Sequence, residues 1–206
     1  MTEHDLDGAY QIDGPEDAKN LYRDWATEYD REFTATMGYV APQKISGLFL
    51  NEWQGDGVAL DVGAGTGALA EHLPGITLDA FDISPEMLEV AGQKGLYRNR
   101  IAGDLTQPLQ IADGTYQGVI SSGTFTHGHV GAGCLDELLR IASSGAQFTC
   151  GTNAQIFDSM GFGSTLARLV AEGKITPVRF QEILFYEGVD HEHKNDTGLV
   201  MMFRKM

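Results

Sequence analysis

The chain has 206 residues and a formal net charge of -15 at pH 7. This length suits one domain with a substantial core and is too short for two full domains. Because basic residues are few, the chain has no broad basic surface for phosphate backbones or anionic membranes, which argues against nucleic acid and membrane as partners and favours a small-molecule substrate.

The N-terminal part of the chain is predicted to be a mobile leader followed by a helix. Residues 1–16 contain five acids and few large apolar residues, so we expect a mobile acidic leader. Beyond it, Leu21, Trp25 and Tyr29 recur at every fourth position and form one apolar stripe, which predicts a helix from Asp17 onward.

A second helix is predicted to open at Pro42, which suits a first-turn position, and to end before Gly55. We therefore expect N-terminal helices over residues 17–54 and a core over residues 55–206, together making one domain that spans residues 17–206.

From residue 58 onward, predicted strands and helices alternate, an order that is typical of a parallel sheet. Ser84 and Pro85 suit the cap and the first position of one of these helices. Two strand-like runs at the C-terminal end have only a polar loop between them, so they should pair antiparallel. The expected strands are 58–62, 77–82, 99–103, 117–122, 146–150, 178–186 and 199–203, and the expected helices are 66–73, one from Pro85, 134–142 and 164–171.

The segment Asp61-Val-Gly-Ala-Gly-Thr-Gly67 lies between the first of these strands and the helix expected after it. Glycines at alternate positions allow a tight turn and a close approach of a ligand beside the free amides of a helix. The glycines alone also satisfy the looser dinucleotide fingerprint. A carboxylate at Asp61 would repel a pyrophosphate but could accept a hydrogen bond from an ammonium group, which favours a zwitterionic ligand.

Two more strands are predicted to end in acids. Asp82 follows Gly63 by 19 positions, where a carboxylate could hold a ribose diol. Asp104 follows the third strand and could accept from an adenine amino group, with Leu105 as an apolar wall beside it. Three acids at strand ends are thus expected at one crevice.

With these motifs the chain resembles the class I S-adenosylmethionine-dependent methyltransferases, and Ile83-Ser-Pro-Glu-Met-Leu88 is also typical of that family. The resemblance implies an α/β, Rossmann-like, seven-stranded and mostly parallel sheet with an antiparallel C-terminal strand, helices on both faces and N-terminal lid helices. It implies S-adenosylmethionine as cofactor and S-adenosylhomocysteine as product. The segment Leu21-Tyr22-x-x-Trp25-Ala26-x-x-Tyr29-Asp30 looks like the small Williams-Beuren-region-type members.

The resemblance also implies roles for single residues. Ser122 and Gly123 should line the methionine part of the cofactor, Phe125 and His129 should face the acceptor, and His127 is the candidate catalytic base. The expected cofactor-binding residues are Asp61, Gly63, Ala64, Gly65, Gly67, Asp82, Ile83, Asp104, Leu105, Ser122, Gly123, Tyr22, Trp25 and Tyr29.

Each of these side-chain roles has a simpler alternative. His127 could position the acceptor without moving a proton, and the aromatic stripe of the first helix could merely pack on the core rather than form a lid. No metal is expected, because His127-x-His129 and His191-x-His193 lack a placed third ligand, and loop solvation explains the second pair better.

The remaining features indicate a soluble cytoplasmic protein. The start of the chain is acidic where a signal peptide would be basic and then apolar, and no apolar run approaches the roughly 18 residues of a membrane helix. Cys134 and Cys150 lack metal-site spacing and make no disulfide framework, as expected in a reducing compartment.

The favoured function is methyl transfer to a small molecule by in-line displacement. A nicotinamide-dependent oxidoreductase and a non-catalytic cofactor-binding module are the alternatives. The sequence identifies neither the methyl acceptor nor the oligomeric state.

Overall fold

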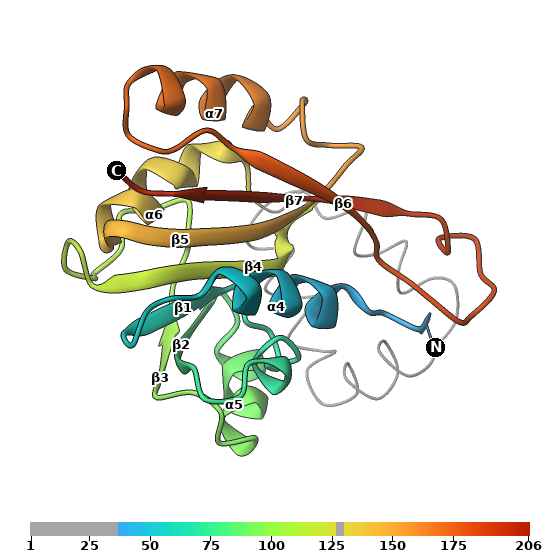
Figure 1. Cartoon of the computed structure of the whole chain (residues 1–206). Helices are drawn as coiled ribbons and strands as arrows, with labels where there is room; N and C mark the ends of the chain where they lie inside the picture. Colours follow the sequence, from blue (N-terminus) through green and yellow to red (C-terminus); the bar gives the residue numbers. More distant parts are fainter. Residues whose placement is uncertain (1–36, 127–129) are drawn as a thin grey trace.

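A computed structural model describes residues 37–126 and 130–206, and Figure 1 shows their arrangement as a sheet between helices. The helices are α4 (Ala41–Glu52), α5 (Pro85–Gln93), α6 (Leu135–Ile141) and α7 (Phe162–Ala171), with short 3-10 turns η2 (Ala70–His72) and η3 (Ala132–Cys134). The strands are β1 (Val58–Val62), β2 (Thr77–Asp82), β3 (Asn99–Ala102), β4 (Tyr116–Phe125), β5 (Ala142–Asn153), β6 (Arg179–Leu184) and β7 (Thr197–Arg204).

The seven strands form one sheet in the order β3-β2-β1-β4-β5-β7-β6. The strands β1 to β5 pair in parallel, whereas β7 lies antiparallel between β5 and β6. The order reverses between β1 and β4, and in open α/β sheets such a switch point opens a crevice at the carboxyl ends of the strands. The predicted fold class, including the antiparallel C-terminal strand, is confirmed.

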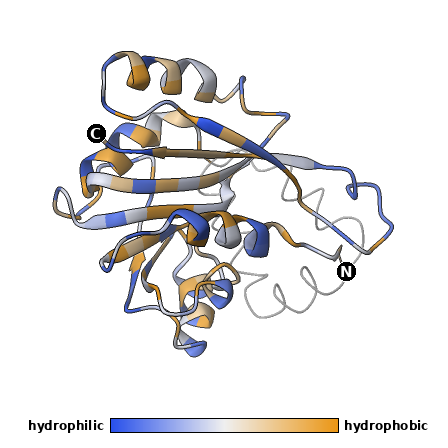
Figure 2. Ribbon diagram, viewed as in Figure 1, coloured by the Kyte–Doolittle hydropathy of each residue, from blue (hydrophilic) through white to orange (hydrophobic). Residues whose placement is uncertain are grey.

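Helices cover both faces of the sheet because side chains alternate along each strand. On one face, Leu78 packs in the cluster that holds Ile45 and Phe49 of α4, and Ala80 of the same strand packs against Leu88 of α5. The helices α6 and α7 cover the other face. Figure 2 shows that α7 carries many hydrophobic residues, while the loop between β6 and β7 is mostly hydrophilic.

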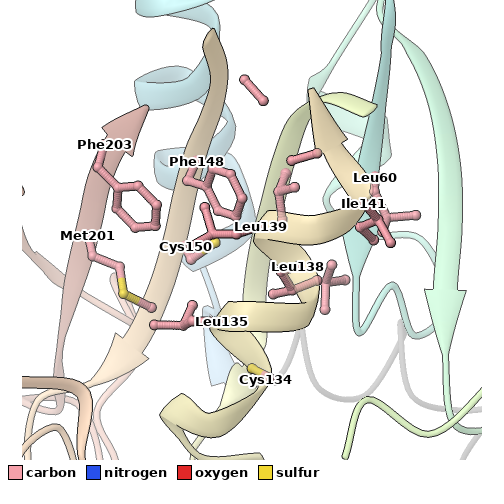
Figure 3. Close-up of a cluster of buried hydrophobic side chains, with 14 of the residues drawn as sticks. Leu60, Cys134, Leu135, Leu138, Leu139, Ile141, Phe148, Cys150, Met201 and Phe203 are labelled. Atoms are coloured by element: carbon pink, nitrogen blue, oxygen red, sulfur yellow. The ribbon is translucent and has the colours of Figure 1, made fainter. Parts of the chain in front are cut away.

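The core between α6 and the sheet is shown in Figure 3. Leu138 and Leu139 of α6 lie toward Phe148 of β5, and the ring of Phe148 stacks on Phe203 of β7 with 4.7 Å between ring centroids. Both cysteines lie in this cluster as buried free thiols. Burial raises the pKa of the Cys134 thiol to about 12, so this thiol stays protonated and serves as packing.

The helix expected over residues 66–73 is wrong. Only the three-residue turn η2 forms there, after Gly67 at φ +89° and before Pro74. Few residues remain between these two breakers, and starting a helix is costly, so the local pattern is too short to form one. The hydroxyl of Ser46 on α4 donates instead to the Leu69 carbonyl at 3.2 Å and ties this segment to the neighbouring helix.

The N-terminal expectations fall outside the described residues. This holds for the leader over residues 1–16 and for the first helix with its aromatic stripe, so the predicted domain boundaries stay predictions. In the described part of the chain, no helix is long and apolar enough to cross a membrane.

Candidate functional site

A cleft of about 990 Å³, counted to its open mouth, lies at the carboxyl edge of the sheet. This size is within the usual range of small-molecule sites. The lining comes from the turn after β1, the ends of β2 and β4, the loop after β3 and the segment before α4. The lining residues are Tyr39, Pro42, Val62, Gly63, Ala64, Gly65, Thr66, Ala68, Leu69, Phe81, Asp82, Ile83, Met87, Gly103, Asp104, Leu105, Thr106, Ser122, Gly123, Thr124 and Val130.

The glycine turn is packed on one side and open on the other. Gly63 adopts φ +66°, and a Cβ there would collide with the hydroxyl of Thr124, which donates to the Val62 carbonyl at 2.6 Å. Gly65 adopts φ +53°, and a Cβ there would meet no described atom within 4 Å. The turn therefore fits tightly against β4 while its second glycine leaves space toward the cleft.

The amides of this turn are used within the protein. The N–H groups of Gly63 and Ala64 donate to the Phe81 carbonyl at 2.8 and 3.0 Å, and the N–H of Gly65 donates to Asp82 Oδ2 at 2.7 Å. Because these amides are occupied and no α-helix follows within residues 66–73, the turn lacks the helix N-terminus on which a dinucleotide pyrophosphate rests. The geometry thus disfavours the dinucleotide alternative.

Asp82 is held between the glycine turn and the start of α5. Its Oδ1 accepts from the Ser84 N–H at 2.9 Å, and the Ser84 hydroxyl separately caps the helix by accepting from the Met87 N–H at 3.2 Å. Burial raises the pKa of Asp82, and the hydrogen bonds from backbone amides oppose this rise. The carboxylate is therefore fixed in orientation at the edge of the cleft, as the ribose prediction requires.

Asp61 lies behind the turn rather than on the wall of the cleft. Its carboxyl group is 1% exposed, and Oδ2 accepts from the Tyr97 hydroxyl at 2.6 Å. Among the described residues, Oδ1 has no hydrogen-bond partner. Burial raises the pKa of Asp61 to about 7, with a contribution from the charge of Asp82, while the bond from Tyr97 lowers it.

The loop after β3 forms a further part of the wall. Asp104 Oδ1 accepts from both the N–H and the hydroxyl of Thr106, at 2.8 and 2.7 Å. Within the described part of the chain, Asp104 Oδ2 has no hydrogen-bond partner. Leu105 beside it is buried. This leaves one acceptor next to an apolar surface, the pair that an adenine ring would need.

A clamp from α6 holds this loop in place. Glu137 Oε1 accepts from the Leu109 N–H at 2.6 Å, and the Arg140 guanidinium donates to the carbonyls of Leu109 and Ile111 at 3.0 and 2.9 Å. The hydrogen bond from Arg140 lowers the pKa of Glu137 to about 2, so the clamp stays charged at neutral pH.

The end of β4 places Ser122 and Gly123 on the cleft wall, as predicted. Phe125, by contrast, is 1% exposed and lies in the core, where its ring contacts Phe162 at 5.4 Å between centroids. A bulge in the pairing of β4 with β5 lies between Ser121 and Phe125, and the expectation that Phe125 faces an acceptor is not supported by this placement.

Sequence reasoning did not identify Tyr39, which lines the cleft beside Ser122. Burial raises the pKa of the Tyr39 hydroxyl to about 12, and a hydrogen bond with the Ser122 side chain opposes the rise. The residue is anchored by its neighbours, since the Val40 N–H donates to the Phe185 carbonyl at 2.8 Å and the Gly38 carbonyl accepts from Glu187 at 2.9 Å. No local motif marks Tyr39, because its position depends on pairing with a segment far along the chain.

Several predicted residues cannot be placed. Tyr22, Trp25, Tyr29, His127 and His129 lie outside the described residues. Gly67 is described but does not line the cleft.

The second histidine pair is not the solvated loop pair expected. The ring of His191 lies 4.9 Å from that of Tyr186, and its Nε2 is 3.1 Å from the Met37 carbonyl. His193 Nδ1 is 3.1 Å from Asp196 Oδ2. Both rings are partly buried because the loop folds back on the start of the described chain. Among residues 37–126 and 130–206, no group of three or more metal-ligating side chains occurs.

Residues 60–150 match a family model described as a methyltransferase domain. Several solved structures share the fold. A methyltransferase from Thermotoga maritima that depends on S-adenosylmethionine has 16% identity and a TM-score of 0.62, covering 91% of this chain and 99% of that chain. A TehB-like one from Corynebacterium glutamicum has 18% identity and a TM-score of 0.60, covering 91% and 99%.

A third similar structure is the Haloferax volcanii chain solved in complex with the Trm112 methyltransferase activator, with 16% identity, a TM-score of 0.60 and coverage of 90% and 98%. A comparison with curated proteins finds no match.

Proposed function

Because the chain belongs to the class I S-adenosylmethionine-dependent methyltransferases, we propose that it transfers the methyl group of this cofactor to a small-molecule acceptor by in-line displacement. The observation that carries the proposal is the cleft at the switch point of the sheet, where a glycine turn, Asp82 and the Asp104 loop share one wall. A cleft of this size suits a nucleoside cofactor with a compact acceptor.

The residues of the cleft fit S-adenosylmethionine. Asp104 Oδ2 and Leu105 would hold the adenine, Asp82 would hold the ribose, and Gly65 leaves open space at the methionine end. Asp61 Oδ1, which has no partner among the described residues, would accept from the ammonium group. When bound, the cofactor supplies an electrophilic methyl group on a sulfonium.

The protein's own contribution is grip and orientation. In-line transfer needs no metal, and holding the acceptor in a near-attack geometry accounts for much of the rate. We propose Tyr39 as part of the roof over the methionine end, because its hydroxyl is fixed by Ser122. The roles of His127 as a base and of His129 and the N-terminal aromatic residues belong to the same proposal.

A small-molecule acceptor is supported by charge. With a net charge of -15, the chain lacks the basic footprint that a tRNA or DNA substrate requires. We propose a cytoplasmic enzyme on the same sequence grounds. The Haloferax volcanii chain was solved with a protein activator, so the test below also includes protein acceptors.

The function is tested by following a labelled methyl group from S-adenosylmethionine. The purified protein is incubated separately with a metabolite extract, total tRNA and a protein extract. We expect label in small molecules only. Label in tRNA or protein would contradict the acceptor class, and cofactor binding without transfer to any pool would favour the non-catalytic alternative.

Asp104→Asn is expected to weaken binding of S-adenosylhomocysteine about tenfold, because a lost hydrogen bond to a charged group costs roughly 1.5 to 3 kcal/mol. Asparagine can keep the Oδ1 bonds to Thr106, so the loop should hold its shape while the adenine loses a carboxylate. Titration calorimetry measures the affinity. Glu182→Gln, an exposed acid on β6, is the charge-matched control, and equal affinities of the two variants would remove Asp104 from the site.

A further inference from the structure

We propose that Tyr97 is a positioning residue for the cofactor: its hydroxyl holds Oδ2 of Asp61, so that Oδ1 remains for the ammonium group of S-adenosylmethionine. This inference rests on the proposed function and deepens it. Neither the glycine motif nor the acids at the strand ends points to Tyr97, which lies in the loop between α5 and β3.

The fold brings Tyr97 to the back of the glycine turn. Its ring lies so close to Gly67 that a Cβ at position 67 would stand 3.1 Å from a ring carbon. The ring also packs against the small cluster of Ala64, Ala80 and Leu88. The third glycine of the motif therefore serves a purpose different from that of Gly65, since it makes room for a side chain of the protein rather than for the ligand.

From this position, Tyr97 reaches the buried carboxylate with a bond of 2.6 Å. Donors to an ionised carboxylate form short, strong hydrogen bonds. One carboxylate oxygen is thereby fixed, and the torsional freedom of the Asp61 side chain is removed. The other oxygen has no partner within the described part of the chain, an arrangement that is costly for a buried carboxylate unless a ligand satisfies it.

The groups that face Asp61 make a cation welcome there. Asp82 of β2 repels its charge, and the neutral thiol of Cys150 on β5 also lies within electrostatic range. Tyr97 itself faces Glu71, which is paired with Lys94 at 2.6 Å. Among the described residues, no basic side chain forms an ion pair with Asp61, so the Tyr97 hydroxyl is the donor that favours the charged carboxylate.

This role gives Tyr97→Phe a signature that a purely structural role would not give. Without the donor, the pKa of Asp61 rises above its present value of about 7, so the carboxylate is more often protonated near neutrality. We expect S-adenosylhomocysteine to bind the variant about tenfold more weakly near pH 7. About two pH units higher, the carboxylate ionises in both proteins and the ratio of dissociation constants should fall toward one. Using the ratio cancels the titration of the ligand's own amino group.

Tyr116→Phe is the matched control. The Tyr116 hydroxyl also donates to a buried carboxylate, Asp79 Oδ2 at 3.1 Å, but Asp79 is not among the residues that line the cleft. This variant should bind like wild type at both pH values. A second comparison starts from Asp61→Asn, where adding Tyr97→Phe should bring no further pH-dependent loss because the titrating group is gone.

The inference is overturned if Tyr97→Phe binds like wild type near pH 7, or if its loss of affinity is the same at both pH values. The comparison within the Asp61→Asn background decides the matter if the single variant folds poorly, since a pH-dependent loss there would also contradict it. A wild-type protein that binds no S-adenosylhomocysteine at any pH would contradict the proposed function itself.

Discussion

Gly63→Ala is expected to destabilise the protein by about 2–5 kcal/mol and to abolish cofactor binding. Alanine at φ +66° costs about 1–2 kcal/mol, and overpacking in a tight site costs about 1–3 kcal/mol more. The added methyl would displace the Thr124 hydroxyl, which accepts from Ser121 at 3.0 Å and donates to the Val62 carbonyl. Urea unfolding and calorimetric titration with S-adenosylhomocysteine measure the two effects.

Gly75→Ala separates strain from collision. Gly75 also has a positive φ, +80°, but a Cβ there would meet nothing within 4 Å, and the residue lies outside the cleft. Its substitution should cost only the backbone term, roughly 1 kcal/mol, and leave cofactor affinity unchanged. If the two variants lost equal stability, the contact with Thr124 would carry no weight.

The parts of the fold that the sequence predicts are those specified by neighbours in the chain. The apolar run before Asp61, the cap formed by Ser84 and Pro85, and the polar loop between the last two strands are local signals, and each led to the observed element. The helix over residues 66–73 failed because the breakers on both sides leave too short a span, a matter of length that apolar periodicity does not report.

The candidate site divides in the same way. Backbone positions at strand ends are predictable, and Gly63, Gly65, Asp82, Asp104 and Ser122 all line the cleft. Side-chain direction near the end of a strand is less predictable, because one irregular residue turns the next side chain to the other face. Phe125 follows such an irregularity in β4 and lies in the core.

Contacts between distant segments were not predictable at all. Tyr97 reaches Asp61 across 36 positions, and Tyr39 is anchored by pairing with Tyr186. Neither residue belongs to a motif, and each acquires its position only when the sheet is assembled. Both change the reading of the site, since one fixes a carboxylate from behind and the other covers the cleft from the front.

Asp61→Asn is expected to make the cofactor-free protein more stable above pH 7 while weakening cofactor binding. The pKa of Asp61 rises from its ordinary 3.8 in the unfolded chain to about 7 on folding. Between these values the native state holds a proton that the unfolded state has released, so stability falls as the pH rises through this window. Above it, the native state carries a buried charge opposed by Asp82, a cost that asparagine removes.

The expected gain in stability is about 1–3 kcal/mol at a pH one unit above the window, since each unit of pKa shift corresponds to about 1.4 kcal/mol. Asparagine can still accept from Tyr97, so packing should be retained. Denaturant unfolding across the pH range measures the effect. Asp79→Asn is the contrasting control: the hydrogen bonds from Arg98 at 2.9 and 2.7 Å help to hold the pKa of Asp79 below its ordinary value, so that variant should lose stability at neutral pH and approach wild type in acid. If Asp61→Asn also lost stability at high pH, the carboxylate would be a structural support, whereas a gain coupled to weaker cofactor binding identifies a charge kept in the fold for its ligand.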